Sequence, residues 1–259
     1  MITAILARRR ILLAKQSGAV PSADMVLLIN SPNTEDFSVT TNYGTFTAAK
    51  VSEYPYFDTT VTHKLSIRDI TFSNGLSLSY DYSVSGLFVG VESWGTSNTY
   101  TSTSDLFSEC YRLRGIPASW EGLGAVTNTV NMFSYCASLA SIPASWEGLG
   151  AVTNADGMFG DCIALASIPA SWEGLGELTT ASCMFRNCTS LTNCGTTFTG
   201  LAKATNVMHL FRGCTGMQGD IHALYVYLST KPIAVSYYVH CFRDCTQAVG
   251  YSSIPASWK

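Results

Sequence analysis

The sequence predicts a mainly β protein with short helices, in which a small antiparallel β domain is followed by a solenoid of 26-residue coils. The nonapeptide Ile-Pro-Ala-Ser-Trp-Glu-Gly-Leu-Gly begins at Ile116, Ile142 and Ile168, a spacing of 26 both times. Residues before 101 instead place apolar side chains at alternate positions, which indicates short strands. Only 13% of the residues are charged and 47% are hydrophobic, so disorder caused by low hydrophobicity is excluded.

The charge of the chain argues against nucleic-acid binding and is distributed unevenly, with a basic segment at residues 1–24. A formal net charge of -3 argues against a globally basic nucleic-acid-binding protein. No run of 18 apolar residues exists, so no membrane span is predicted. Residues 1–24 contain Arg8, Arg9, Arg10 and Lys15, which predict a basic N-terminal arm for docking or anchoring. A frayed or packed terminal helix is the alternative. The basic residues follow the first apolar stretch, the reverse of a secretory signal, so another route to any surface is expected.

Residues 25–100 are predicted to form the antiparallel β domain. Short alternating or apolar segments are separated by turns rich in Asn, Gly, Pro and Asp, and Asn74-Gly75 suits a two-residue hairpin. The expected strands are 26–29, 37–40, 45–47, 61–67 and 76–80.

Residues 101–259 are predicted to form the solenoid, because a second motif keeps the register of the nonapeptide. Each unit has a Phe, a Cys three residues later and an apolar residue three residues after that. A 26-residue unit cannot bury these side chains alone, but stacked units can place each one on its counterpart. The predicted structural core of the repeats is Phe107, Phe133, Phe159, Phe185, Phe211, Cys110, Cys136, Cys162, Cys188, Cys214, Leu113, Leu139, Leu165 and Leu191.

The repeats become irregular toward the C-terminus. Cys194-Gly195 replaces the Ile-Pro pair, and the unit that starts at Leu210 expands to 31 residues before Cys241-Phe242. The chain then closes on another Ile-Pro-Ala-Ser-Trp at 254–258. Degenerate terminal units are what a solenoid needs to cover its open ends.

The nine cysteines are interpreted as repeat positions, because six of them follow the repeat period and metal sites usually bring cysteines in close pairs. We expect a stack of buried, reduced thiols that act as small apolar side chains. Two alternatives stay open, a disulfide between adjacent coils and a zinc site in one cluster. That cluster would combine His209, Cys214, His240, Cys241 and Cys245. The prediction is no metal and no cofactor.

No catalytic constellation is found, so the protein is not expected to be an enzyme. Four histidines are too scattered to place a base beside a Cys or Ser nucleophile. Glu121, Glu147 and Glu173 recur along one edge as a charge ladder, and the Gly-x-Gly pairs lack the Gly-Lys-Ser/Thr of a phosphate loop.

The repeated tryptophans allow two interpretations. Trp120, Trp146 and Trp172 could form an exposed aromatic row that stacks on sugar rings or holds a partner. Alternatively, each could pack inside its coil. They are the candidate binding residues of the chain.

The order Phe, Cys, Leu, Ile-Pro resembles the BspA-like leucine-rich repeats. The 26-residue length and the Met-Phe start are also similar to related surface-protein repeats of mycoplasmas and other bacteria. The resemblance covers Leu106 to Lys259 and implies a leucine-rich-repeat solenoid with a short strand per coil. It implies surface recognition or adhesion only in general terms, because one fold serves many functions.

These features together predict a non-enzymatic virion protein, a phage head or tail fibre or receptor-binding protein. Its N-terminal region would contact other virion proteins and form a homotrimer, and its repeats would contact a host surface protein or glycan. No nucleic-acid partner is expected. The alternatives are a bacterial cell-surface adhesin of the BspA-like repeat family and an intracellular protein-binding scaffold.

Overall fold

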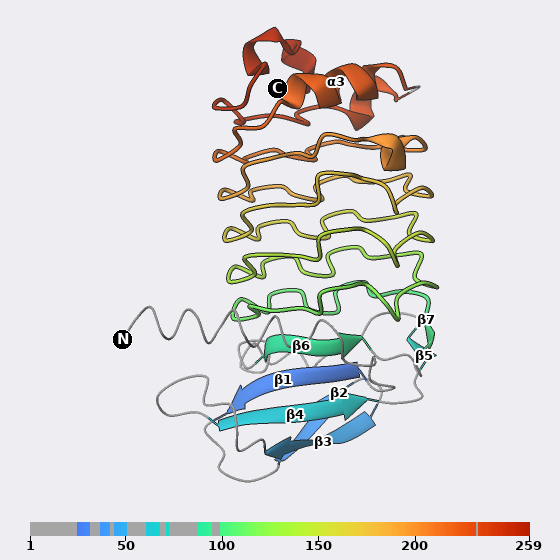
Figure 1. Cartoon of the computed structure of the whole chain (residues 1–259), viewed down its shortest axis with the longest axis vertical. Coiled ribbons are helices and arrows are strands. Elements are labelled where there is room, and N and C mark those ends of the chain that lie inside the picture. Colours follow the sequence, from blue (N-terminus) through green and yellow to red (C-terminus); the bar gives the residue numbers. More distant parts are fainter. Residues whose placement is uncertain are drawn as a thin grey trace.

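A five-stranded antiparallel sheet lies at one end of the molecule and a stack of coils extends from it (Figure 1). The computed structural model describes residues 25–31, 37–41, 44–50, 61–67, 71–72, 88–94, 99–231 and 233–259. The sheet has the order β2-β3-β4-β1-β6. Its strands are β1 (Met25–Ser31), β2 (Phe37–Thr41), β3 (Gly44–Lys50), β4 (Val61–Ile67) and β6 (Phe88–Trp94).

β1 is the inner strand that joins the two parts of this sheet. It pairs with β4 from Met25 opposite Ile67 to Ser31 opposite Val61, and it pairs with β6 on its other side. β5 (Thr71–Phe72) and β7 (Thr99–Tyr100) form a separate parallel pair. The predicted arm at 1–24, the predicted strand 76–80 and the Asn74-Gly75 turn lie outside the described residues.

β6 belongs to the sheet and to the stack of coils at the same time. Its Val91 N–H donates to the Gly115 carbonyl (2.9 Å), and Gly90 forms a parallel bridge with Gly115. Trp94 at its end is buried and stacks on Trp120 of the next coil (ring centroids 5.8 Å apart). The stack therefore begins within residues 25–100, before the predicted boundary at 101.

Successive coils are held together by hydrogen bonds that repeat with the sequence period. Parallel bridges connect Ser102, Asn128, Asn154, Thr180 and Asn206 in turn. The neighbouring threonines form a ladder in which each backbone N–H and each hydroxyl donates to the threonine carbonyl of the preceding coil. The ladder runs through Thr101, Thr127, Thr153, Thr179 and Thr205. These contacts satisfy backbone groups without long strands, because each bridge involves one residue per coil.

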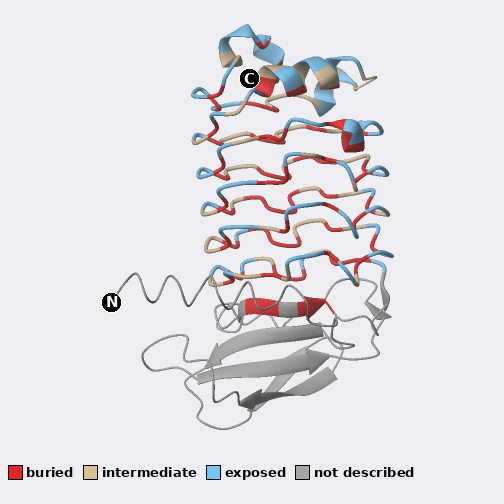
Figure 2. Cartoon of the chain, in the orientation of Figure 1, coloured by how far each residue is buried: buried red, intermediate tan, exposed pale blue. Residues whose placement is uncertain are grey.

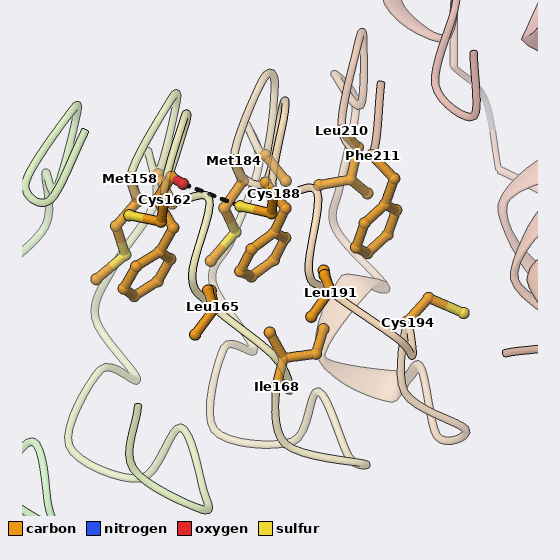
Figure 3. Packing of buried hydrophobic residues seen from close by; sticks show 14 of the residues in the cluster. Met158, Cys162, Leu165, Ile168, Met184, Cys188, Leu191, Cys194, Leu210 and Phe211 are labelled. Atoms are coloured by element: carbon orange, nitrogen blue, oxygen red, sulfur yellow. Dashed lines mark hydrogen bonds between the residues drawn. The ribbon is translucent and has the colours of Figure 1, made fainter. Parts of the chain in front are cut away.

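The interior of the stack consists of columns of recurring side chains that form one continuous hydrophobic cluster. Buried segments recur in each coil (Figure 2). Phe107, Phe133, Phe159, Phe185 and Phe211 stack with ring centroids 5.4 to 5.6 Å apart and interplanar angles of 3 to 9°. The cysteine and leucine columns lie beside them (Figure 3). All fourteen residues expected to form the repeat core are buried.

The C-terminal end of the stack has a different construction. The 31-residue unit contains α3 (Ile221–Ser229), which begins where the Asp220 carboxylate accepts a hydrogen bond from the Ala223 N–H (3.1 Å). The helix buries Ile221, Leu224 and Leu228 against the preceding coil. Short 3-10 turns follow the helix, namely η2 (Val235–Tyr237), η3 (Tyr251–Ser253) and η4 (Ala256–Trp258), and another, η1 (Thr199–Leu201), lies in an earlier coil.

Within the described part of the chain, no helix is both long and apolar enough to cross a membrane.

Candidate functional site

The cysteine column has a structural role that explains why Cys recurs at this position. Five thiols donate to the carbonyl of the Phe in the preceding coil, over 3.1 to 3.2 Å, and they belong to Cys136, Cys162, Cys188, Cys214 and Cys245. Figure 3 shows one such bond, from Cys188 Sγ to the carbonyl of Phe159. A thiol is small enough for this interior and is also a weak donor, so it fills space and gives a second donor to a carbonyl that already accepts the backbone N–H of the Cys in its own coil.

The thiols are all reduced, and their environment makes them unreactive. None of the nine cysteines forms a disulfide, and every one except Cys183 is buried. Burial raises the pKa of Cys110 and of Cys162 to about 12, so neither forms the reactive thiolate near neutral pH. The described residues contain no group of three or more metal-ligating side chains, and this includes the region of His209, Cys214, His240, Cys241 and Cys245.

The tryptophan column is not an exposed row, and that interpretation of Trp120, Trp146 and Trp172 is wrong. All three side chains have no exposed surface. They stack on one another inside the coils, with ring centroids 6.3 Å apart for the first pair and 6.0 Å for the second. The physical reason is that a coil this narrow needs large side chains to fill it, and stacking inside removes the most apolar area from water.

The indole N–H groups of this column are satisfied unevenly. Trp94 and Trp120 donate to the serine carbonyls of the next coil, Ser119 (2.7 Å) and Ser145 (3.0 Å). Trp172 donates to Cys194, but Trp146 Nε1 is buried with no partner among the described residues. The column also changes geometry at Trp146. The planes of the Trp146 and Trp172 rings meet at 32°, whereas those of Trp120 and Trp146 meet at 8°.

One side of the stack combines a constant backbone with changing side chains, and we call it the turn edge. It consists of the segments 105–112, 131–138, 157–164, 183–190, 209–216 and 240–247. The residues two before and two after each Phe adopt positive φ in all six segments, with φ of 51 to 67° where they are not glycine. Residues other than glycine seldom adopt a positive φ, so the recurrence of these angles shows that every coil makes the same unusual turn.

The sequence of the turn edge changes from coil to coil even where the Ile-Pro segment of the unit is copied. The segments Ile116–Asn128 and Ile142–Asn154 are identical over thirteen residues. By contrast, the residue two after Phe is Glu109, then Tyr135, then Asp161 in successive coils. Because these positions tolerate many side chains on one backbone, the turn edge can vary its surface without a change of fold.

The N-terminal half of the turn edge exposes apolar side chains. Tyr111, Tyr135 and Ile163 are 51%, 49% and 49% exposed, although such large apolar residues are usually buried. The sequence interpretation did not select these residues. The signal that could have found them was the difference between adjacent copies of the unit, because an interior position cannot vary so freely.

The C-terminal half of the turn edge is basic. Arg186, Arg212 and Arg243 each follow a column Phe, and His209 and His240 each lie two residues before one. The two imidazole rings are 5.5 Å apart, and the N–H of each following arginine donates to its histidine carbonyl across the turn (3.1 and 3.2 Å). We call these five residues the basic cluster.

The glutamate ladder lies on a different part of the coil surface. Glu121, Glu147 and Glu173 are exposed and follow the buried tryptophans, in turns where a glycine has positive φ. At Gly148, with φ of 97°, an added Cβ would lie 2.7 Å from the Trp120 carbonyl oxygen, so this turn tolerates only glycine. This constraint helps explain why the segment is copied without change.

Comparison with known proteins relates the repeats to one family. No curated protein and no solved structure matches the chain. Residues 101–224 match the family described as "Mycoplasma protein of unknown function, DUF285". The matched region contains the regular coils, and the match agrees with the resemblance of their sequence to mycoplasma-type repeat surface proteins. The coil stack of this chain is therefore similar to a mycoplasma protein family whose function is undefined.

Proposed function

We propose that this chain is a non-enzymatic recognition protein that attaches to a cell surface through the turn edge of its coil stack. The observation that carries the proposal is a contrast within the regular units: the segment that begins at Ile-Pro is copied, including its exposed Glu, whereas the exposed residues of the turn edge change from coil to coil. Copying preserves the stack, whereas the exposed residues at one edge determine what the stack can contact. Exposed aromatic side chains such as Tyr111 and Tyr135 suit contact with sugar rings or a protein partner.

The setting that we propose is a phage virion, as a head or tail fibre or receptor-binding protein with a leucine-rich-repeat solenoid. The N-terminal region would contact other virion proteins and form a trimer, and the coil stack would point toward the host. The separation of the sheet and the coils to opposite ends of the molecule favours this arrangement (Figure 1). The second candidate is a bacterial cell-surface adhesin, which the similarity to a mycoplasma family favours.

The attachment proposal is tested by comparing two edges of the same coil. Tyr135→Asn changes an exposed side chain of the turn edge, and asparagine accepts the positive φ of this position. Glu147→Gln is the matched control, because Glu147 is also exposed but lies in the copied segment. We expect Tyr135→Asn to weaken binding to host cells or to an array of surface glycans by about tenfold, as removal of a central aromatic anchor does. Equal binding by both variants and the parent would contradict the proposal.

The setting is tested by the mass of the protein in solution. A trimer in light scattering would favour the fibre, and a strict monomer would favour the adhesin.

A further inference from the structure

We propose that the basic cluster is a binding site for an acidic polysaccharide that lies along the coil stack. This inference rests on the proposed attachment function and names the chemistry of the partner. The cluster consists of Arg186, Arg212, Arg243, His209 and His240, and its members come from three successive coils.

The spacing of the cluster suits a linear polymer. Adjacent coils are joined by parallel backbone hydrogen bonds at the turn edge, from Asn187 N–H to the Arg212 carbonyl (2.7 Å) and from Gly213 N–H to the Arg243 carbonyl (2.8 Å). Parallel chains bonded in this way are about 4.8 Å apart. The arginines therefore form a row with one guanidinium group per coil, comparable with the rise of one sugar ring along an extended polysaccharide. A compact anion would contact one coil, but a polymer can contact all three.

The positive charge of the row is incompletely neutralised by the protein. Arg186 donates to Asp161 (2.9 Å), and Arg243 lies 3.8 Å from Asp244. Arg212, between them in the stack, has no ion pair within the described part of the chain. The unpaired guanidinium of Arg212 therefore supplies the positive charge that is most available to an external acid.

A polysaccharide fits this edge better than a nucleic acid does. Three arginines can contact few phosphates, whereas nucleic-acid binding depends on many such contacts and on a strongly basic surface. The whole chain carries a net charge of -3. Tyr135 is half exposed, and it is close enough to Arg186 for an electrostatic interaction. A sugar ring can stack on this tyrosine while its acidic group reaches the arginine row.

The two histidines make the proposed site sensitive to acid. Burial and the charges of Arg212, Arg186 and Arg243, together with the neighbouring His240, lower the pKa of His209. The pKa of His240 is also lowered, by burial and by Arg243 and Arg212, against the opposing effect of Asp244. Both imidazoles are therefore neutral near pH 7 and gain positive charge on acidification. A bound polyanion stabilises the protonated forms, so binding is expected to strengthen as the pH falls.

The test measures binding of the full chain to dextran sulfate and to polygalacturonate, with neutral dextran and single-stranded DNA as comparison probes. Arg212→Gln removes the unpaired charge of the row. Lys203→Gln is the matched control, because Lys203 is an exposed cation outside the turn edge, paired with Glu177. We expect Arg212→Gln to weaken binding of the acidic polysaccharide about three- to tenfold, Arg212→Gln/Arg243→Gln to abolish it, and Lys203→Gln to leave it within about twofold.

The pH dependence is tested with His209→Asn/His240→Asn, since asparagine accepts the positive φ of both positions. We expect the parent to bind dextran sulfate more tightly in mild acid and the double variant to lose that increase. Equal losses for Arg212→Gln and Lys203→Gln would overturn the inference, because they would show nonspecific attraction. So would binding to DNA that exceeds binding to both polysaccharides. If no acidic polysaccharide binds but Tyr135→Asn still impairs attachment to cells, this inference fails and the attachment function stands.

Discussion

The same five residues, Ile-Pro-Ala-Ser-Trp, have different structures at 142–146 and at 254–258. In the first copy, Trp146 lies in the tryptophan column between Trp120 and Trp172. In the second copy, η4 places Trp258 on the phenylalanine column, stacked on Phe242 at 6.2 Å and 18°. Its carbonyl accepts from the Phe242 N–H (2.9 Å), as Met158 accepts from Phe133 in the regular coils.

The cause of the difference is the coil that lies beneath each copy. Before the second copy, the tryptophan column has already ended, and Leu224 and Leu228 of α3 fill the interior there. Trp172, the last of its column, lies at 88° to Phe211. The indole of residue 258 therefore has no tryptophan to stack on, and it covers the ring of Phe242, the last Phe of the column, which is buried as a result. The role of a repeated residue is set by its neighbours in space as much as by its position in the unit.

The largest effect is expected at the centre of the regular stack. Phe159→Ala removes a ring packed between Phe133 and Phe185 at 5.4 and 5.5 Å. The cavity should lower the free energy of unfolding by about 3–5 kcal/mol, measured by urea denaturation. Phe198→Ala is the control outside the column and should cost less, because Phe198 has one aromatic neighbour in the described chain, Tyr227, whereas Phe159 is packed between two phenylalanine rings. A cost for Phe159→Ala no larger than for Phe198→Ala would contradict the role of the column.

A smaller and local effect is expected at the C-terminal end. Trp258→Ala should lower the free energy of unfolding by about 2 kcal/mol, because the indole packs on Phe242 and Tyr225 in an irregular unit that can open without the regular coils. The Phe242 N–H donates to the backbone carbonyl of residue 258, so hydrogen exchange of the Phe242 amide should become faster in this variant. Exchange of the Phe133 amide, in the regular coils, should not change. Equal acceleration at both amides would show that the end is not a separate cooperative unit.

Trp120 and Trp146 differ in whether the indole N–H has a hydrogen-bond partner. Trp120 and Trp146 are both fully buried and stacked, but Trp120 donates to Ser145 and Trp146 has no partner among the described residues. Trp120→Phe should therefore destabilise the protein by about 1 kcal/mol more than Trp146→Phe does. Each variant is the other's control for lost ring area. Equal destabilisation would mean that the Ser145 contact contributes nothing to stability.

The smallest effect is expected from the histidines of the C-terminal coils. Because the folded pKa of His209 and His240 lies below the ordinary value of 6.5, the unfolded chain takes up protons first as the pH falls. The free energy of unfolding should decrease below about pH 6.5 and the loss should be complete below the folded pKa values. His209→Asn/His240→Asn should flatten this dependence in urea titrations. An unchanged pH profile would show that other groups cause it.

The sequence predicted the period and the inward positions well, because identical residues at fixed spacing define columns such as that of Phe107 and Phe133. It could not place the tryptophans, since an indole suits either a buried stack or an exposed binding surface. It also missed α3, because that helix lies in the unit where the repeat pattern had broken down. Its N-cap, Asp220, occupies the position of Cys194 in the preceding unit.

The turn edge was missed for a different reason. Exposed residues such as Tyr135 lie next to a strong repeat signal, and the repeat directs attention to what is constant. The residues that we propose for function are instead those that differ between adjacent copies of the unit.

β6 has a consequence for how such a molecule can change over generations. It is an edge strand of the sheet and pairs with the first coil, while α3 and Trp258 cover the far side of the regular coils, so the regular coils lie between two irregular regions. Each regular coil contacts its two neighbours, and the phenylalanine stack and the threonine ladder recur at the junctions between regular coils. Recombination between copies such as 116–128 and 142–154 can therefore add or remove one complete coil. The length of the molecule, and the number of turns it displays, can change in single steps while both ends remain as they are.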